Sequence, residues 1–197
     1  ELEKRRDQQR KRRSQANAPL VAIVGYTNAG KSTLLNALTG SDVLVENKLF
    51  ATLDTRSRRM HLDLGHEIVL TDTVGFIRDL PRELFSAFKA TFEEASHADL
   101  LLHVVDAADP AHEEQINTTL ELLGELELLS VPRLLVLNKS DLLLRENAEN
   151  IARRFGGVAV SATQRESLRA LVERMRGLLW TPALELSELS EISAAGE

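Results

Sequence analysis

The sequence predicts an α/β fold in which helices form layers on both faces of a six-stranded, mostly parallel sheet. From about residue 19 onward, short apolar runs of strand length alternate with segments of helical spacing, which is typical of this fold class. One unit is especially informative: an apolar run at 20–24, a glycine-containing loop at 25–32 and a helical pattern at 33–38. The alternation therefore predicts one α/β domain with a loop of special composition after its first strand.

The remaining elements follow in chain order. Strands are expected at 20–24, 58–64, 67–72, 99–105, 133–137 and 157–160. Helices are expected at 32–39, about 82–95, 112–128, 146–154 and 164–179. The runs at 58–64 and 67–72 flank Gly65-His66 and predict a hairpin, which supplies the one antiparallel strand. Pro110 suits the start of the third helix, and Pro132 closes it.

The composition suits a single domain with short extensions. The 197 residues are 43% apolar, enough for one core. The absence of cysteine excludes disulfides and thiolate metal sites. No apolar run approaches the roughly 18 residues of a membrane-spanning helix, and no signal peptide is present. We therefore expect a cytoplasmic protein without a membrane span, and we expect it to be a monomer.

The charge is distributed unevenly along the chain. Residues 1–13 hold seven basic and three acidic residues, a net +4 in a chain whose total is −6. Because the chain begins with Glu1 rather than Met, we expect 1–18 to be a basic helical arm or linker from a missing upstream domain. Such an arm can also bind a polyanion such as RNA. Residues 19–180 would form the folded α/β domain.

The last segment, 181–197, holds four Glu and no basic residue, and we expect an acidic tail or linker. Its large aliphatic residues could form one or two turns of a weakly amphipathic helix; they are Leu184, Leu186, Leu189 and Ile192.

Residues 25–32 complete the phosphate-loop pattern G-x-x-x-x-G-K-[ST]. In this geometry, backbone N–H groups of the loop and the following helix N-terminus converge on phosphates. Lys31 would reach the β- and γ-phosphates, and Ser32 would ligate Mg²⁺. The residues expected around the phosphates are Gly25, Tyr26, Thr27, Asn28, Ala29, Gly30, Lys31, Ser32 and Thr33. The pattern predicts that a nucleoside triphosphate binds here.

Residues 138–141, Asn-Lys-Ser-Asp, follow an expected strand and indicate which base is bound. Asp141 can accept two hydrogen bonds from the N1–H and exocyclic amino group of guanine, an edge that adenine lacks. Asn138 can bridge either to the base or to the phosphate loop, and the stem of Lys139 can lie along the purine face. Ser161-Ala162, after the last strand, resembles the short motif whose backbone N–H meets guanine O6. These residues predict GTP or GDP as the ligand.

Two further segments are candidates for sensing the γ-phosphate. Asp72, at the end of the third strand, can hold the hydration shell of Mg²⁺. It opens a segment that continues with Thr73, Val74 and Gly75. Gly75 has the backbone freedom to turn its N–H onto the γ-phosphate. Residues 41–57 form a polar connection longer than most ordered loops, which favours a functional role.

Thr52, in this polar connection, is the candidate whose hydroxyl joins Mg²⁺ only when the γ-phosphate is present. Phe50 and Leu53 frame it as an anchored segment, and Thr55 is the alternative. With Thr52, the expected metal ligands are Ser32, directly, and Asp72, through water.

Together these motifs resemble the translation-factor-like branch of P-loop GTPases, which have a Ras-like fold. The sequence is most similar to the HflX family, over about residues 19–180. The phrases that carry the resemblance are Gly25–Thr33, Ala51–Asp54, Asp72–Ile77 and Leu101–Asp106. Thr55 departs from the family, where Pro is common, so the choice between the two threonines stays open.

The resemblance implies a GTP-hydrolysing factor that binds the large ribosomal subunit and its RNA and splits ribosomes under stress. It also implies an N-terminal domain joined to the G domain by a helical segment, of which 1–18 would be the end. The alternatives are a non-hydrolysing guanine-nucleotide sensor, or a related G domain that serves RNA modification or ion uptake.

Two residues refine the expected hydrolysis. Ras-like enzymes carry a Gln directly after the glycine that corresponds to Gly75, and this Gln orients the attacking water. In this chain that position is Phe76. Intrinsic hydrolysis should therefore be slow, with the water positioned by backbone, a cation or a partner. Asn28 lies at a loop position where this chain resembles potassium-activated GTPases, which carry Asn there. Its side-chain oxygen would help to hold K⁺, or the residue would only tolerate the backbone conformation of the loop. The residues expected to act in hydrolysis are Lys31, Thr52, Gly75 and Asn28.

Overall fold

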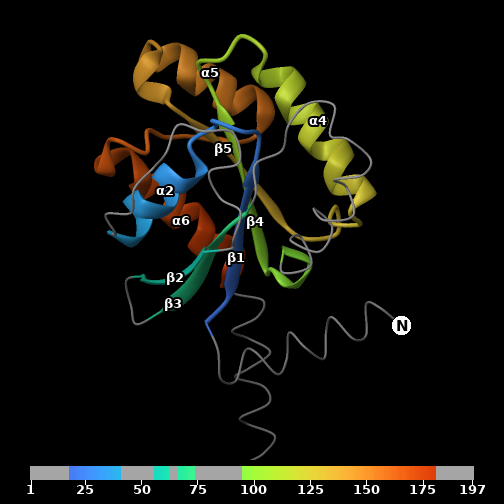
Figure 1. Cartoon of the computed structure of the whole chain (residues 1–197). Helices are drawn as coiled ribbons and strands as arrows, with labels where there is room; N and C mark the ends of the chain where they lie inside the picture. Colours follow the sequence, from blue (N-terminus) through green and yellow to red (C-terminus); the bar gives the residue numbers. More distant parts are fainter. Residues whose placement is uncertain (1–17, 41–55, 63–65, 74–94, 181–197) are drawn as a thin grey trace, which may run out of the picture.

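The computed structural model describes residues 18–40, 56–62, 66–73 and 95–180. Its centre is a six-stranded sheet of order β2-β3-β1-β4-β5-β6 (Figure 1). The strands are β1 (Leu20–Gly25), β2 (Arg56–His61), β3 (Glu67–Asp72), β4 (Leu100–Asp106), β5 (Arg133–Asn138) and β6 (Val158–Ala159). The helices are α2 (Lys31–Thr39), α4 (His112–Glu125), α5 (Arg145–Phe155) and α6 (Leu168–Leu179). Short 3₁₀ turns are η2 (Ala95–His97), η3 (Ser140–Leu142) and η4 (Arg165–Ser167).

The strand directions confirm the predicted sheet. β1 runs parallel to both of its neighbours, with Val21 opposite Leu70 of β3 and Leu100 of β4. Among the described strands, only β2 is antiparallel, because the short connection to β3 makes a hairpin that pairs Arg56 with Asp72. The parallel strands end at the same edge of the sheet, so the loops after β1, β4 and β5 lie close together, beside the end of β3.

Helices cover both faces of the sheet, as the three-layer prediction requires. Alternate residues of β1 point to opposite faces. Ile23 packs with α2 and α6 in one apolar cluster, whereas Val24 packs with α4 in another. A third cluster joins α4 and α5 to β4 and β5 through Ile116, Ala152 and Leu137. Figure 1 shows the same division, with α2 and α6 on one side of β1 and α4 on the other.

Most element boundaries differ from the prediction by a few residues, as is common at frayed ends. The helix expected to reach residue 128 ends at Glu125, because Glu127 adopts φ 58° and the amide of Leu128 donates to the carbonyl of Leu123 at 2.8 Å. The last helix begins as the 3₁₀ turn η4 and becomes α-helical at Leu168. The helix expected at 82–95 lies almost wholly outside the described residues. In the described part of the chain, no helix combines the length and the apolar character that crossing a membrane requires.

Candidate guanine-nucleotide site

The phosphate loop joins β1 to α2 and depends on its two glycines. Gly25 has φ 147°, and a Cβ there would lie 2.1 Å from the carbonyl oxygen of Val104 on the adjacent strand. Gly30 has φ 90°, and a Cβ there would lie 2.3 Å from the side-chain nitrogen of Asn138. Both glycines of the G-x-x-x-x-G-K-[ST] pattern are therefore fixed by backbone conformation and close packing. Between them, Asn28 is exposed and left-handed, with φ 61°.

The N-terminus of α2 has no side-chain cap. Gly30 is its N-cap and accepts the first helical hydrogen bond from Leu34 at 2.9 Å. The first turn of α2 contains no acidic residue. A helix N-terminus attracts anions through its first N–H groups and its dipole, so this end of α2 suits the phosphates of a nucleotide.

Lys31 is a buried cation beside the loop. The residue is only 8% exposed, and its Nζ donates to the carbonyl oxygen of Tyr26 at 2.9 Å. Burial lowers the pKa of Lys31 from 10.5 to about 8, an effect that the Asp72 carboxylate opposes. The ammonium group is therefore held in a place where an anionic ligand would strongly favour its charged form.

Ser32 and Asp72 meet at the ends of α2 and β3. The hydroxyl of Ser32 donates to Oδ2 of Asp72 at 2.6 Å, and Asp72 is 1% exposed. Next to it, the hydroxyl of Thr73 donates to the carbonyl oxygen of Ile23 at 2.7 Å and anchors the end of β3. The described residues contain no cluster of three or more His, Asp or Glu side chains that could hold a metal alone. The donor set fits Mg²⁺, which usually takes one or two protein oxygens and completes its shell with water and phosphate.

Asn138 connects the phosphate loop to the segment that follows β6. Its Nδ2 donates to the carbonyl oxygen of Ala29 at 2.9 Å, and its Oδ1 accepts from the amide of Ala162 at 3.0 Å. The side chain is 1% exposed, so both hydrogen bonds are made away from water. Of the two partners considered for Asn138, the structure therefore shows the phosphate loop.

The loop after β5 presents the other two residues of its motif. Lys139 has φ 61°, and its Nζ makes an ion pair with Oδ2 of Asp106 at 2.7 Å. Asp106 ends β4 and also accepts from the amide of Ala108 at 3.0 Å. Asp141 lies in η3 with its side chain exposed, where it can accept hydrogen bonds from a ligand.

Ser161 and Ala162 close the same edge of the sheet, but their amides already have partners. The amide of Ser161 donates to Oγ of Ser167 at 2.9 Å, and that of Ala162 donates to Asn138. A contact with guanine O6 stays a prediction; it requires one of these N–H groups to be shared with the base.

The structure leaves part of the predicted site undescribed and adds one residue to it. Thr52, Thr55, Val74, Gly75 and Phe76 lie outside the described residues. Asp106 was not among the predicted site residues, although a carboxylate that ends a strand next to the Asn138 loop was a usable signal. It holds Lys139 by an ion pair and thereby orients this loop.

Comparisons with known proteins agree with this geometry. Residues 20–139 match the family model described as 50S ribosome-binding GTPase. The GTPase HflX of Caldanaerobacter subterraneus subsp. tengcongensis is 58% identical over 143 residues, which are 73% of this chain and 33% of that protein. The GTPase HflX of Lacrimispora saccharolytica is 40% identical over an alignment that covers 100% of this chain and 47% of that protein. A solved structure of a GTP-binding protein from Sulfolobus solfataricus in complex with GDP superposes with a TM-score of 0.67 at 29% identity, over 82% of this chain and 52% of that one.

The fold is therefore that of a P-loop GTPase domain, with its phosphate loop and its Asn-Lys-Ser-Asp motif at the same edge of the sheet. The chain belongs to the HflX family of GTPases. It spans between a third and a half of the length of these two curated relatives.

Proposed function

We propose that this chain binds GTP, hydrolyses it to GDP and phosphate, and changes its affinity for a partner with the nucleotide state. The observation that carries the proposal is the double hydrogen bond of Asn138, at 2.9 Å to Ala29 and 3.0 Å to Ala162. It joins a loop suited to phosphates with two loops suited to guanine. Family membership supports a guanine nucleotide as the ligand.

Each described residue has a distinct role in this proposal. The charge of Lys31 and the N-terminus of α2 bind the β- and γ-phosphates. Asp141 accepts from the N1–H and amino group of guanine, and the stem of Lys139 lies along the purine face. The remaining loop residues, 25–30 and Thr33, surround the phosphates with backbone N–H groups.

Two cations are part of the proposal. Mg²⁺ would be held by Ser32 and, through water, by Asp72; when bound, it neutralises charge on the phosphates. Thr52, with Thr55 as its alternative, would add a hydroxyl when the γ-phosphate is present. K⁺ would be held with the help of the Asn28 side-chain oxygen.

Hydrolysis is proposed to be slow without a partner. Phe76 can neither accept a proton nor orient water, so that position contributes nothing to the attack. The N–H of Gly75 would donate a hydrogen bond to the γ-phosphate. Loss of the γ-phosphate would then release the segments that contain Thr52 and Gly75.

The proposed partner is the large ribosomal subunit and its RNA, a proposal supported by the family model and by the HflX relatives. A cytoplasmic location and a monomeric state belong to the same proposal. So does the division of the chain into a basic arm at 1–18, a G domain at 19–180 and an acidic segment at 181–197.

Two measurements test the function. Multiple-turnover phosphate release, with and without ribosomal subunits, should show slow release alone and faster release with subunits. No release under either condition would favour the non-hydrolysing sensor. Co-sedimentation with subunits in the presence of a GTP analogue or of GDP tests the partner separately, since it reads binding rather than hydrolysis. Absent or nucleotide-independent binding would count against the ribosome as partner.

A further inference from the structure

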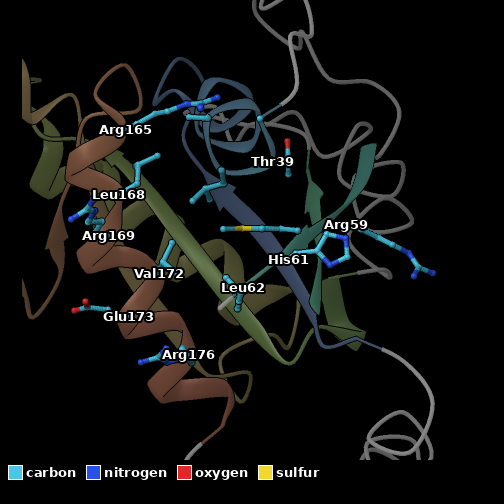
Figure 2. A pocket seen from close by; sticks show the side chains of 14 residues that line it. Thr39, Arg59, His61, Leu62, Arg165, Leu168, Arg169, Val172, Glu173 and Arg176 are labelled. Atoms are coloured by element: carbon cyan, nitrogen blue, oxygen red, sulfur yellow. The ribbon is translucent and has the colours of Figure 1, made fainter. Parts of the chain in front are cut away.

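A concave region is lined by residues that do not belong to the candidate nucleotide site. It is a groove of about 800 Å³ between the end of α2, the edge strand β2 and the last helix, α6 (Figure 2). One end is at Gly40, where Arg165 approaches the backbone of α2, and the other is at Leu62 and Arg176. In Figure 2, Leu168 and Val172 point from the helix toward the middle of the groove.

The floor of the groove is apolar. Leu38, Leu62 and Leu168 are between 5% and 8% exposed, and all three belong to the main hydrophobic cluster. Met60 and Val172 pack against the same cluster and are only partly covered by the described residues. An occupant that lies along this floor would therefore bury apolar surface.

The rim of the groove is basic, although the chain as a whole has a net charge of −6. Four arginines and one histidine line it, against the single carboxylate of Glu173. Arg59 is paired with Glu67 at 3.3 Å. Within the described part of the chain, no ion pair engages the other three arginines, which are Arg165, Arg169 and Arg176.

An apolar floor with a basic rim fits an acidic amphipathic helix better than RNA. A helix in a groove places an apolar stripe on the floor and its charges on the rim. An RNA backbone would pair with the arginines but leave the floor exposed to water, and the described lining has no Phe, Tyr or Trp on which bases could stack.

The chain carries a segment of this kind directly after α6. We propose that residues 183–193 dock in the groove as a short acidic helix, so that the acidic end of the chain is an intramolecular ligand of its own G domain. Leu186, Leu189 and Ile192 repeat every three residues and would lie on the floor. The acidic residues that would face the arginines of α6 are Glu185, Glu188 and Glu191.

The connection and the length suit this arrangement. Trp180 stacks on His66 at a centroid distance of 4.4 Å, which anchors the end of α6 near Leu62. Thr181 and Pro182 favour the end of one helix and the start of another, as N-cap and first residue. From Arg165 to Arg176 the rim is about 17 Å long, and a helix of residues 183–193 has nearly the same length.

Because residues 183–193 are joined to α6 by a short linker, weak contacts are sufficient to keep them docked. A short linker gives an effective concentration of about 1 mM, so an intrinsic dissociation constant of about 0.1 mM leaves the segment docked roughly ten times out of eleven. A docked segment would touch Gly40 and Met60, on either side of the polar connection 41–57 that contains Thr52. Nucleotide-dependent changes in that connection would therefore alter the docking of residues 183–193.

The absence of cysteine allows a direct test on the full chain. Spin labels at Glu173→Cys and Ser187→Cys should give one narrow, short distance. Reversing the rim charges with Arg165→Glu and Arg169→Glu should broaden the distance distribution. Adding Glu188→Arg and Glu191→Arg, at the end of the segment that would lie beside these two positions, should restore it. Arg174→Glu, on the same helix but not lining the groove, should change nothing. Unchanged nucleotide binding by each variant would show that the G domain is folded.

Three results would overturn the proposal. The first is a broad distance distribution in the parent chain that the charge reversal does not alter. The second is a short distance that appears only between two singly labelled chains, which would make a second copy the occupant. The third is a short RNA that binds with an affinity dependent on Arg165 and Arg169 while the distance stays broad, which would assign the groove to RNA.

Discussion

The candidate site has a buried half and an exposed half, and they hold their polar groups differently. Lys31, Asp72 and Asn138 are 8%, 1% and 1% exposed, and each has a hydrogen bond within the protein. Asn28 and Asp141, at the same edge of the sheet, have exposed side chains. A buried polar group must find its partner in the protein, whereas an exposed one can exchange water for a ligand at small cost. We therefore expect the buried half to determine stability and geometry, and the exposed half to determine recognition.

The largest effect is expected from Asn138→Ala. The change leaves the buried carbonyl of Ala29 and the buried amide of Ala162 without the partners that they now have. At about 2 kcal/mol for each unsatisfied group, the free energy of unfolding should fall by about 4 kcal/mol. Nucleotide affinity should fall as well, because the loops are no longer joined. Chemical denaturation and titration with fluorescent GDP measure the two effects.

Asn147→Ala is the matched control for this substitution, since it removes an exposed amide from α5. It should change stability by no more than about 0.5 kcal/mol. If the two variants were equally stable, the assignment of Asn138 as the link between the loops would be wrong.

The second effect concerns the buried charge of Lys31 in the nucleotide-free chain. Its pKa is lowered from 10.5 to about 8, so between these pH values the folded state holds fewer protons than the unfolded state. The free energy of unfolding should therefore rise by about 3 kcal/mol from pH 8 to pH 10.5, and the cost of burying the charge is fully present below pH 8. Denaturation at a series of pH values measures this slope.

Lys31→Met should abolish this rise, and it should also abolish nucleotide binding. Lys139→Met removes a lysine from the more exposed part of the site and should leave the rise in place. A slope that persists in Lys31→Met would show that other groups cause it.

The exposed half should respond in specificity rather than in stability. Asp141→Asn replaces an acceptor of guanine hydrogen bonds with a group that can also donate, which suits the carbonyl at position 2 of xanthine. Affinity for GDP should fall about 100-fold, or about 2.7 kcal/mol, while affinity for xanthosine diphosphate rises. The free energy of unfolding should stay within about 0.5 kcal/mol of the parent value. Glu146→Gln, a carboxylate-to-amide change in the first turn of α5, is the control and should leave base preference unchanged.

The same contrast explains what the sequence could predict. The phosphate loop and the positions of the strands along the chain depend on local patterns: glycines at positions with φ 147° and φ 90°, and apolar runs of strand length. The partner of Asn138 could not be chosen in advance, because its contact with Ala29 spans 109 positions in the chain. The ion pair of Asp106 with Lys139 also depends on how two strands lie side by side.

Helix ends and the groove were harder to predict for a related reason. The third helix stops where Glu127 takes a left-handed conformation, although the surrounding residues keep helical spacing. The groove on α6 combines side chains of three elements, and only the fold brings their arginines to one rim.

The smallest effect is expected at Asn28, where the role of the backbone conformation can be tested separately from the role of the side-chain oxygen. Its φ of 61° suits Asn in a loop whether or not the side chain binds a cation. Asn28→Gly keeps that conformation available and removes only the side-chain oxygen. If this oxygen helps to hold K⁺, turnover of the parent chain should be several-fold faster in K⁺ than in Na⁺, and the difference should vanish in Asn28→Gly. Equal rates in both salts for the parent chain would leave Asn28 as a residue that serves the loop backbone alone.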